Sequence, residues 1–301
     1  MMSAVDDEAD MCCAECGIKQ LDDIKLKNCT ACHLVKYCSV ACQKNHRKQH
    51  KKECKKRMAE LRDELLFKQP ESSHFGDCPI CFVPLSIDIN KSALSSCCGV
   101  FICDGCSYAN QMKDARSKRD PVCPFCRQPY ASSNAEAERN AMKLFKAGNL
   151  TAIRQKGCEA KMVHNYGRAM ELLTKAANMG DAVAHYELAN MYGSGGGVEK
   201  DTKKAVHHWE EAAIRGNPEA RFNLGCNDAR NCKFDRAVKH WVIAASQGFD
   251  LALEKLKEWY HMDMGTVRKA DLTTALRAHQ AAIDSTKSPQ REEAATADRS
   301  C

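Results

Sequence analysis

The sequence predicts a multi-domain chain in which two small, metal-stabilised cysteine-rich modules precede an all-α solenoid of helical repeats. Sixteen of the 20 cysteines lie between residues 12 and 126, most of them in closely spaced pairs. No N-terminal stretch joins a basic region to an apolar core, so no secretory signal is expected. Many cysteines without secretion favour metal ligation over disulfides. From residue 134 the chain is rich in alanine and repeats every 32 to 36 residues, which is typical of stacked helix pairs.

The most concentrated chemistry lies in the segment 78–127, which holds four cysteine pairs. Two cysteines separated by two residues form a tight knuckle, and both thiolates can reach one tetrahedral zinc ion at about 2.3 Å. Eight such ligands suit two zinc ions, and the pairs could be used in sequence or alternately. The pairs are Cys78/Cys81, Cys97/Cys98, Cys103/Cys106 and Cys123/Cys126.

This spacing resembles a RING-type zinc finger, in the variant that uses eight cysteines. The resemblance implies alternating use of the pairs, in a cross-braced module. One zinc ion is then held by Cys78, Cys81, Cys103 and Cys106, and the second by Cys97, Cys98, Cys123 and Cys126. The adjacent Cys97 and Cys98 depart from the usual RING pattern, which has a spacer and a histidine in the middle pair.

RING fingers recruit a ubiquitin-charged conjugating enzyme and have no catalytic nucleophile of their own. They use an apolar residue in the first pair, a proline in the last pair and a cation after the last cysteine. This chain has Ile80, Pro124 and Arg127 at those positions. The resemblance therefore implies a candidate ubiquitin ligase scaffold that recruits a ubiquitin-conjugating enzyme. The alternative is a non-enzymatic, zinc-dependent protein–protein interaction adaptor.

An earlier cluster of eight cysteines precedes this segment, and seven of them form four spaced pairs together with His50. Its last two pairs have three intervening residues each, so a helix would bring both members of each pair to one face. The run YCSVACQKNHRKQHKKEC resembles a MYND-type zinc finger. The resemblance implies two further zinc ions, four in the whole chain. One ion is held by Cys13, Cys16, Cys38 and Cys42, and the other by Cys29, Cys32, His50 and Cys54.

Several features of this first cluster remain open at the level of sequence. A register that uses Cys12 in place of Cys13 is an alternative, and His33 and His46 are expected at the surface. MYND fingers generally bind proline-containing peptides. Arg47 stands where they usually carry a tryptophan, which weakens the expectation of peptide binding.

The formal charge of +6 is weak evidence for an acidic partner. Fifteen ligating thiolates and four Zn²⁺ ions would bring the charge of the loaded chain to about −1. The basic run Lys44–Arg57 could be a nuclear-import or nucleic-acid patch, but a solvated helix face is the favoured interpretation. Nucleic acid is therefore not an expected partner.

The alanine-rich region resembles Sel-one-like repeats, relatives of the tetratricopeptide repeat, with about four helix pairs over residues 149–284. Such pairs must stack to bury their apolar faces, and stacking leaves a groove suited to an extended protein partner. Small residues at three positions should allow close helix contact, namely Gly157, Ala189 and Gly225. The aromatic residues Trp209, Trp241, Tyr186 and Phe222 are expected in the core, and the isolated Cys158, Cys226 and Cys232 are expected to be buried or inert thiols.

The predicted boundaries follow from these segments. They are an acidic disordered tail (1–11), a MYND-type module (12–57), a helical linker (58–75), a RING-type module (76–131), helical repeats (134–286) and a disordered tail (287–301). Within the RING-type module a helix is expected over 107–119. The apolar runs are too short to span a membrane, and a cytoplasmic or nuclear location is expected.

Overall fold

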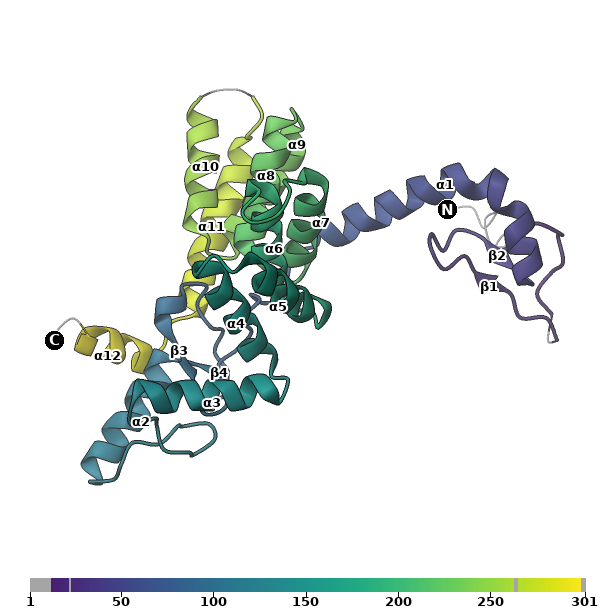
Figure 1. Ribbon diagram of the computed structural model, residues 1–301. Helices are drawn as coiled ribbons and strands as arrows, with labels where there is room; N and C mark the ends of the chain where they lie inside the picture. The colour runs from purple at the N-terminus through teal and green to yellow at the C-terminus, as the bar shows by residue number, and fades with distance from the viewer. Residues whose placement is uncertain (1–11, 22, 263–264, 299–301) are drawn as a thin grey trace. The chain divides into compact units, whose positions relative to one another are not determined.

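The computed structural model describes residues 12–21, 23–262 and 265–298 (Figure 1). The chain divides into two compact units, the first ending at Lys68 and the second beginning at Gln69. The predicted acidic tail at 1–11 lies outside the described residues. The fold is a cysteine-rich N-terminal region followed by an all-helical repeat solenoid, as the sequence predicts. None of the described helices is long and apolar enough to cross a membrane.

The first unit contains the first cysteine module, residues 12–57, and a long helix that continues from it. Strands β1 (Lys27–Asn28) and β2 (Lys36–Tyr37) pair antiparallel, and α1 (Val40–Leu66) follows. Ser39 is the N-cap of α1, and its hydroxyl accepts a hydrogen bond from the backbone N–H of Cys42 at 3.2 Å. The buried core consists of cysteines and Tyr37, so the candidate metal ligands are themselves most of the core.

The second unit begins with the second cysteine module, residues 76–131. Strands β3 (Ser92–Ser95) and β4 (Val100–Cys103) form an antiparallel hairpin after the 3₁₀ turn η2 (Ile89–Lys91). Helix α2 (Asp104–Arg116) follows directly and starts three residues before the predicted position. The reason is that Cys103 acts as its N-cap, with Sγ accepting the N–H of Cys106 at 3.4 Å.

The solenoid consists of α3 and four helix pairs. Helix α4 packs on α5, α6 on α7, α8 on α9 and α10 on α11, which matches the four predicted pairs. The bounds are α3 (Asn134–Lys146), α4 (Leu150–Met162), α5 (Tyr166–Asn178), α6 (Ala182–Ser194), α7 (Thr202–Ile214), α8 (Pro218–Arg230), α9 (Phe234–Ser246), α10 (Asp250–His261) and α11 (Lys269–Ser285).

Small residues and one tryptophan define the solenoid core. A Cβ added at Gly157 would lie 2.9 Å from the Leu173 side chain, and one at Gly225 would lie 2.4 Å from Trp241 Nε1. The prediction of close helix contact at these glycines is confirmed. Trp241 is fully buried, whereas Trp209 is half-buried and donates its indole N–H to Asn190 Oδ1 at 3.3 Å.

One sequence prediction about the remainder of the chain is wrong. Residues 289–298 form helix α12 (Pro289–Asp298), which packs against α2, where a disordered tail was expected. The polar sequence of this segment gives no apolar pattern, and the helix is stabilised instead by polar contacts described below. Of the thiols expected to be buried or inert, Cys158 and Cys226 are half-buried and Cys232 is exposed at a positive-φ turn (φ 58°). Residues 299–301 lie outside the described part of the chain.

The second cysteine module is joined to the repeats within the second unit. The backbone N–H of His74 donates to Gly216 O at 3.3 Å, at the turn between α7 and α8. Phe101 of β4 lies 5.5 Å from the Phe75 ring, and the Arg154 guanidinium of α4 lies 5.7 Å from the Phe101 ring. Helices α3 to α11 therefore share one body with this module.

Candidate metal centres

The described residues contain four groups of side chains that could hold a metal ion. In each group the four ligand atoms all lie within 4.8 Å of one another. The groups coincide with the four alternating sets that the two resemblances imply, including the adjacent Cys97 and Cys98. Cys13 rather than Cys12 belongs to the first group. The members are Cys13/Cys16/Cys38/Cys42, Cys29/Cys32/His50/Cys54, Cys78/Cys81/Cys103/Cys106 and Cys97/Cys98/Cys123/Cys126.

The first module builds its groups from knuckles and from the start of α1. Cys38 and Cys42 lie on either side of the Ser39 cap, with their sulfur atoms 3.6 Å apart. His50 and Cys54 are four residues apart on α1, so they share one face of the helix. His50 Nε2 lies 3.1 Å from Cys32 Sγ. Helix α1 thus contributes a ligand to both groups.

The second module uses the β3–β4 hairpin and the two flanking knuckles. The sulfur atoms of Cys81 and Cys103 are 3.8 Å apart, and those of Cys98 and Cys123 are 4.0 Å apart. Cys97 Sγ lies 3.3 Å from Cys126 Sγ. The turn between β3 and β4 bends sharply at Gly99 (φ 70°), which allows both adjacent cysteines to face the same group.

These distances fit zinc and do not fit disulfides. Four sulfur atoms arranged tetrahedrally at 2.3 Å from one ion are about 3.8 Å apart. A disulfide would require about 2.05 Å, and every cysteine that the structure describes is free. Zinc bound in these groups would supply folding free energy to modules that have little apolar core of their own.

In each group the pKa of one thiol is lowered, which favours its thiolate form. The pKa is lowered to about 6 at Cys13 and Cys29, and to about 7 at Cys78 and Cys123. Burial acts to raise each of these pKa values, but hydrogen bonds outweigh it, mainly from nearby backbone N–H groups. Each of the four is the first cysteine of its knuckle, where the N–H groups of the following residues point back toward the sulfur. Zinc requires the thiolate form, so these positions favour metal binding at neutral pH.

Two polar residues near the groups make contacts that the sequence analysis did not predict. The first is His46, which was expected at the surface. It is half-buried, its Nδ1 lies 3.0 Å from the Tyr37 hydroxyl, and its ring stacks on His50 at 5.7 Å. His46 therefore packs beside a candidate ligand, and its position one helical turn before His50 is the sequence signal for it. His33, by contrast, is exposed as expected.

The second such residue is Arg291 of α12. Its guanidinium donates to Val83 O at 3.0 Å and to Pro84 O at 2.7 Å, and Nη2 lies 3.7 Å from Cys81 Sγ. Burial acts against its charge, but the contacts with Cys103 and Cys81 outweigh it and raise the pKa of Arg291. No local sequence signal links residues 210 positions apart.

The three residues predicted to contact a conjugating enzyme differ in exposure. Ile80 is 38% exposed and Arg127 is exposed, with the backbone of Arg127 in the left-handed region (φ 63°). Pro124 is buried, and the neighbouring Phe125 is 47% exposed. Phe82 is 77% exposed beside Ile80. The two knuckles therefore present apolar side chains, but the proline is not one of them.

Comparison with known proteins identifies two of the three segments. Residues 13–54 match the family model of the MYND finger. Residues 159–181 and 182–217 match the model of the Sel1 repeat. Both resemblances drawn from the sequence are confirmed over these residues. The matched segments do not include the second cysteine module. No curated protein matches the chain.

Two solved structures resemble part of the chain. A Sel1 repeat protein from Oxalobacter formigenes is 23% identical, with a TM-score of 0.44, over 52% of this chain and 66% of its own. A protective antigen of uropathogenic Escherichia coli with an SLR fold is 22% identical, with a TM-score of 0.38, over 64% of this chain and 39% of its own.

Proposed function

We propose that this protein is a zinc-stabilised adaptor for protein–protein interaction, in which the MYND finger and the Sel1 repeats hold different partners. The observation that carries the proposal is the closed ligand set of each candidate metal group. Four protein ligands per group leave no open coordination position for water or substrate, which is typical of structural rather than catalytic zinc. Four zinc ions, two per module, then stabilise surfaces and perform no reaction.

Exposed apolar side chains support this proposal. Leu34 is 48% exposed and Val40 is 66% exposed on the first unit, and Met162 is 78% exposed on the repeats. Met162 and the adjacent Val163, which is 74% exposed, form a contiguous apolar surface of the kind that contacts a protein partner. The free cysteines of the described chain favour a reducing compartment, so we propose a cytoplasmic or nuclear location.

The adaptor is tested by selecting peptides from a displayed random library on the full-length, zinc-loaded protein. We expect one class of peptides whose binding is lost in Leu34→Asp and another class whose binding is lost in Met162→Glu. Each variant serves as the control for the other, and zinc content is measured on both. One peptide of each class should bind the same protein molecule at once. Failure to obtain any peptide, or mutual exclusion of the two classes, would contradict the adaptor.

A second candidate function is ubiquitin ligation through the second cysteine module. It is supported by the ligand spacing and by the exposure of Ile80 and Arg127. With Pro124 buried, Phe125 is the apolar residue that the last knuckle would offer to a ubiquitin-conjugating enzyme. The protein would act by positioning the charged enzyme near a substrate on the repeats, without a covalent intermediate of its own.

Self-ubiquitylation with a panel of conjugating enzymes separates the two functions. Wild type and Arg127→Ala are compared at equal zinc content. Chains formed by wild type and lost in Arg127→Ala would establish the ligase. No chains with any conjugating enzyme, with four zinc ions bound, is the result expected for the adaptor.

A further inference from the structure

Helix α1 carries six cations on one face, which we call the basic stripe: Lys44, Arg47, Lys48, Lys51, Lys52 and Lys55. At 100° per residue these positions fall within an arc of about 140°, and they extend about 16 Å along the helix. The three zinc-ligating positions of α1 lie outside this arc. All six side chains are exposed. The clustering of these cations on one face of the helix is not apparent from the linear sequence alone.

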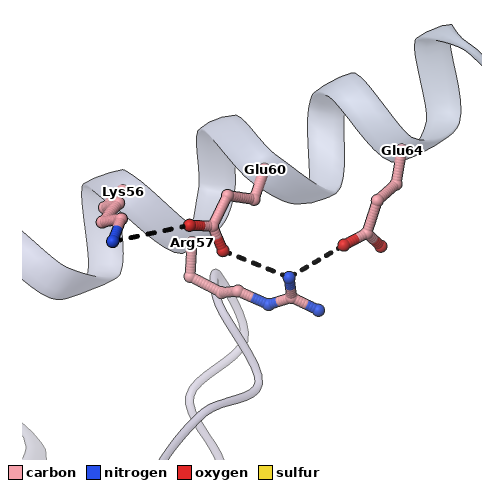
Figure 2. Close-up of polar contacts among 4 residues, drawn as sticks. All are labelled: Lys56, Arg57, Glu60 and Glu64. Carbon is pink, nitrogen blue, oxygen red and sulfur yellow. Dashed lines mark hydrogen bonds and ion pairs between the residues drawn. The ribbon is translucent and has the colours of Figure 1, made fainter.

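The stripe is unpaired, in contrast to the next turn of the same helix. Lys56 lies 3.9 Å from Glu60, and Arg57 lies 3.2 Å from Glu60 and 2.8 Å from Glu64 (Figure 2). Within the described residues none of the six stripe cations forms an ion pair. The single acidic residue between positions 44 and 56 is Glu53, which lies on the opposite side of the helix. The cations Lys56 and Arg57 are therefore paired with carboxylates of the same helix, whereas the cations of the stripe are not.

The charge is local to the first module. Residues 12–57 hold twelve Lys and Arg against four Asp and Glu, a net charge of +8. Seven ligating thiolates and two Zn²⁺ ions reduce this to about +5. The second module, residues 76–131, has a net charge of +1 that becomes about −3 with eight thiolates and two Zn²⁺ ions. The near-neutral total of the loaded chain therefore conceals a strongly basic module.

We propose that the basic stripe binds the phosphate backbone of duplex DNA without sequence preference. The stripe is convex and points cations to both sides of the helix, from Arg47 on one edge to Lys52 on the other. A helix with its side chains is 10–12 Å wide, and the major groove of B-form DNA, about 12 Å wide, is bordered by phosphates on both sides. A flat acidic protein surface would contact only the cations in the middle of the arc and would leave those at its two edges without a partner.

The composition of the stripe excludes two other polyanionic partners. Between residues 44 and 55 the arc contains no aromatic side chain, so it offers no stacking surface for single-stranded nucleic acid. Between these residues the arc also contains no apolar side chain; the exposed apolar residues on this face, Val40 and Met58, lie one turn beyond its two ends and are fewer than a membrane-surface helix requires. The stripe consists of lysine and arginine alone, the side chains that contact phosphates, and phosphate contacts fix position and not sequence.

The test is fluorescence anisotropy of a labelled 20-base-pair duplex of arbitrary sequence with the full-length, zinc-loaded protein. For four to six phosphate contacts, raising the salt from 50 to 200 mM should weaken binding roughly 10²- to 10³-fold. The triple variant Lys48→Gln, Lys51→Gln, Lys55→Gln should reduce the slope of log K against log salt by about 2.7. The control variant Lys19→Gln, Lys25→Gln, Lys27→Gln removes the same charge from exposed positions off the helix and should change the slope little.

Four outcomes overturn the proposal. They are no binding at 50 mM salt, a salt-independent affinity, an equal loss in both triple variants, and equally tight binding of poly-glutamate of the same total charge. The last two would identify general attraction to any polyanion. Circular dichroism and zinc content, measured on each variant, distinguish weaker binding caused by the removed charges from weaker binding caused by unfolding.

Discussion

Arg291→Ala tests whether the C-terminal helix holds the second cysteine module together. In the wild-type protein this guanidinium donates to the backbone carbonyls of Val83 and Pro84, just after the first knuckle, and lies near the sulfur of the candidate ligand Cys81. A cation 3.7 Å from a thiolate contributes about 1–4 kcal/mol for effective dielectric constants between 80 and 20. Because Arg291 is half-buried, the lower half of that range is appropriate. Loss of an outer contact of this kind typically weakens metal binding about 10- to 100-fold.

The assay is release of zinc to a coloured chelator at neutral pH. We expect one of the four zinc ions to leave roughly 10- to 100-fold faster in Arg291→Ala, while the two ions of the first module leave at the wild-type rate. Arg291→Lys keeps the positive charge but loses the planar guanidinium group with its several hydrogen-bond donors, so zinc release from this variant should be intermediate. Arg277→Ala removes an exposed arginine of α11 and is the matched control. Release that is unchanged in Arg291→Ala, or equally fast from both modules, would refute the reasoning.

Three further predictions concern stability. Gly225→Ala places a methyl group against Trp241 and should destabilise the repeats by about 1–3 kcal/mol in chemical denaturation, whereas an unchanged midpoint would show that the helices are not in tight contact. Burial lowers the pKa of His240 to about 3 and that of His74 to about 4, with nearby arginines adding to the effect. Between pH 6.5 and 4 the unfolded chain therefore binds more protons than the folded chain, and the free energy of unfolding should fall by about 2–3 kcal/mol per histidine, an effect that His240→Gln should reduce. Chelation of zinc should unfold both cysteine modules and release α12 while α4 to α11 stay helical, as followed by hydrogen exchange, and a melted solenoid would contradict this.

The sequence predicts the ligand groups well because ligand spacing is a local property. The sulfur atoms of Cys78 and Cys81 can reach one ion wherever the knuckle lies, and the family resemblance supplies the alternation between pairs. The four helix pairs were equally predictable, since the chain is alanine-rich and three of the pairs end at a glycine, Gly180, Gly216 or Gly248. Both features depend on residues within about 50 positions of one another.

Features that depend on distant contacts could not be predicted from sequence. Arg291 lies in a polar segment with no apolar pattern, and only the folded chain brings it to the first knuckle of the second module. The burial of Pro124 and the partial burial of His46 likewise depend on neighbours that local pattern does not reveal. The one-sided arrangement of the basic stripe required the helix to be known from end to end, together with the ion pairs of Arg57.

The most direct test of the central claim, that four closed ligand groups each hold one structural zinc ion, is native mass spectrometry of the full-length protein. The account predicts a mass with four zinc ions in wild type and three in Cys103→Ser, with the first module still loaded. Fewer than four ions in wild type, or four in Cys103→Ser, would contradict it.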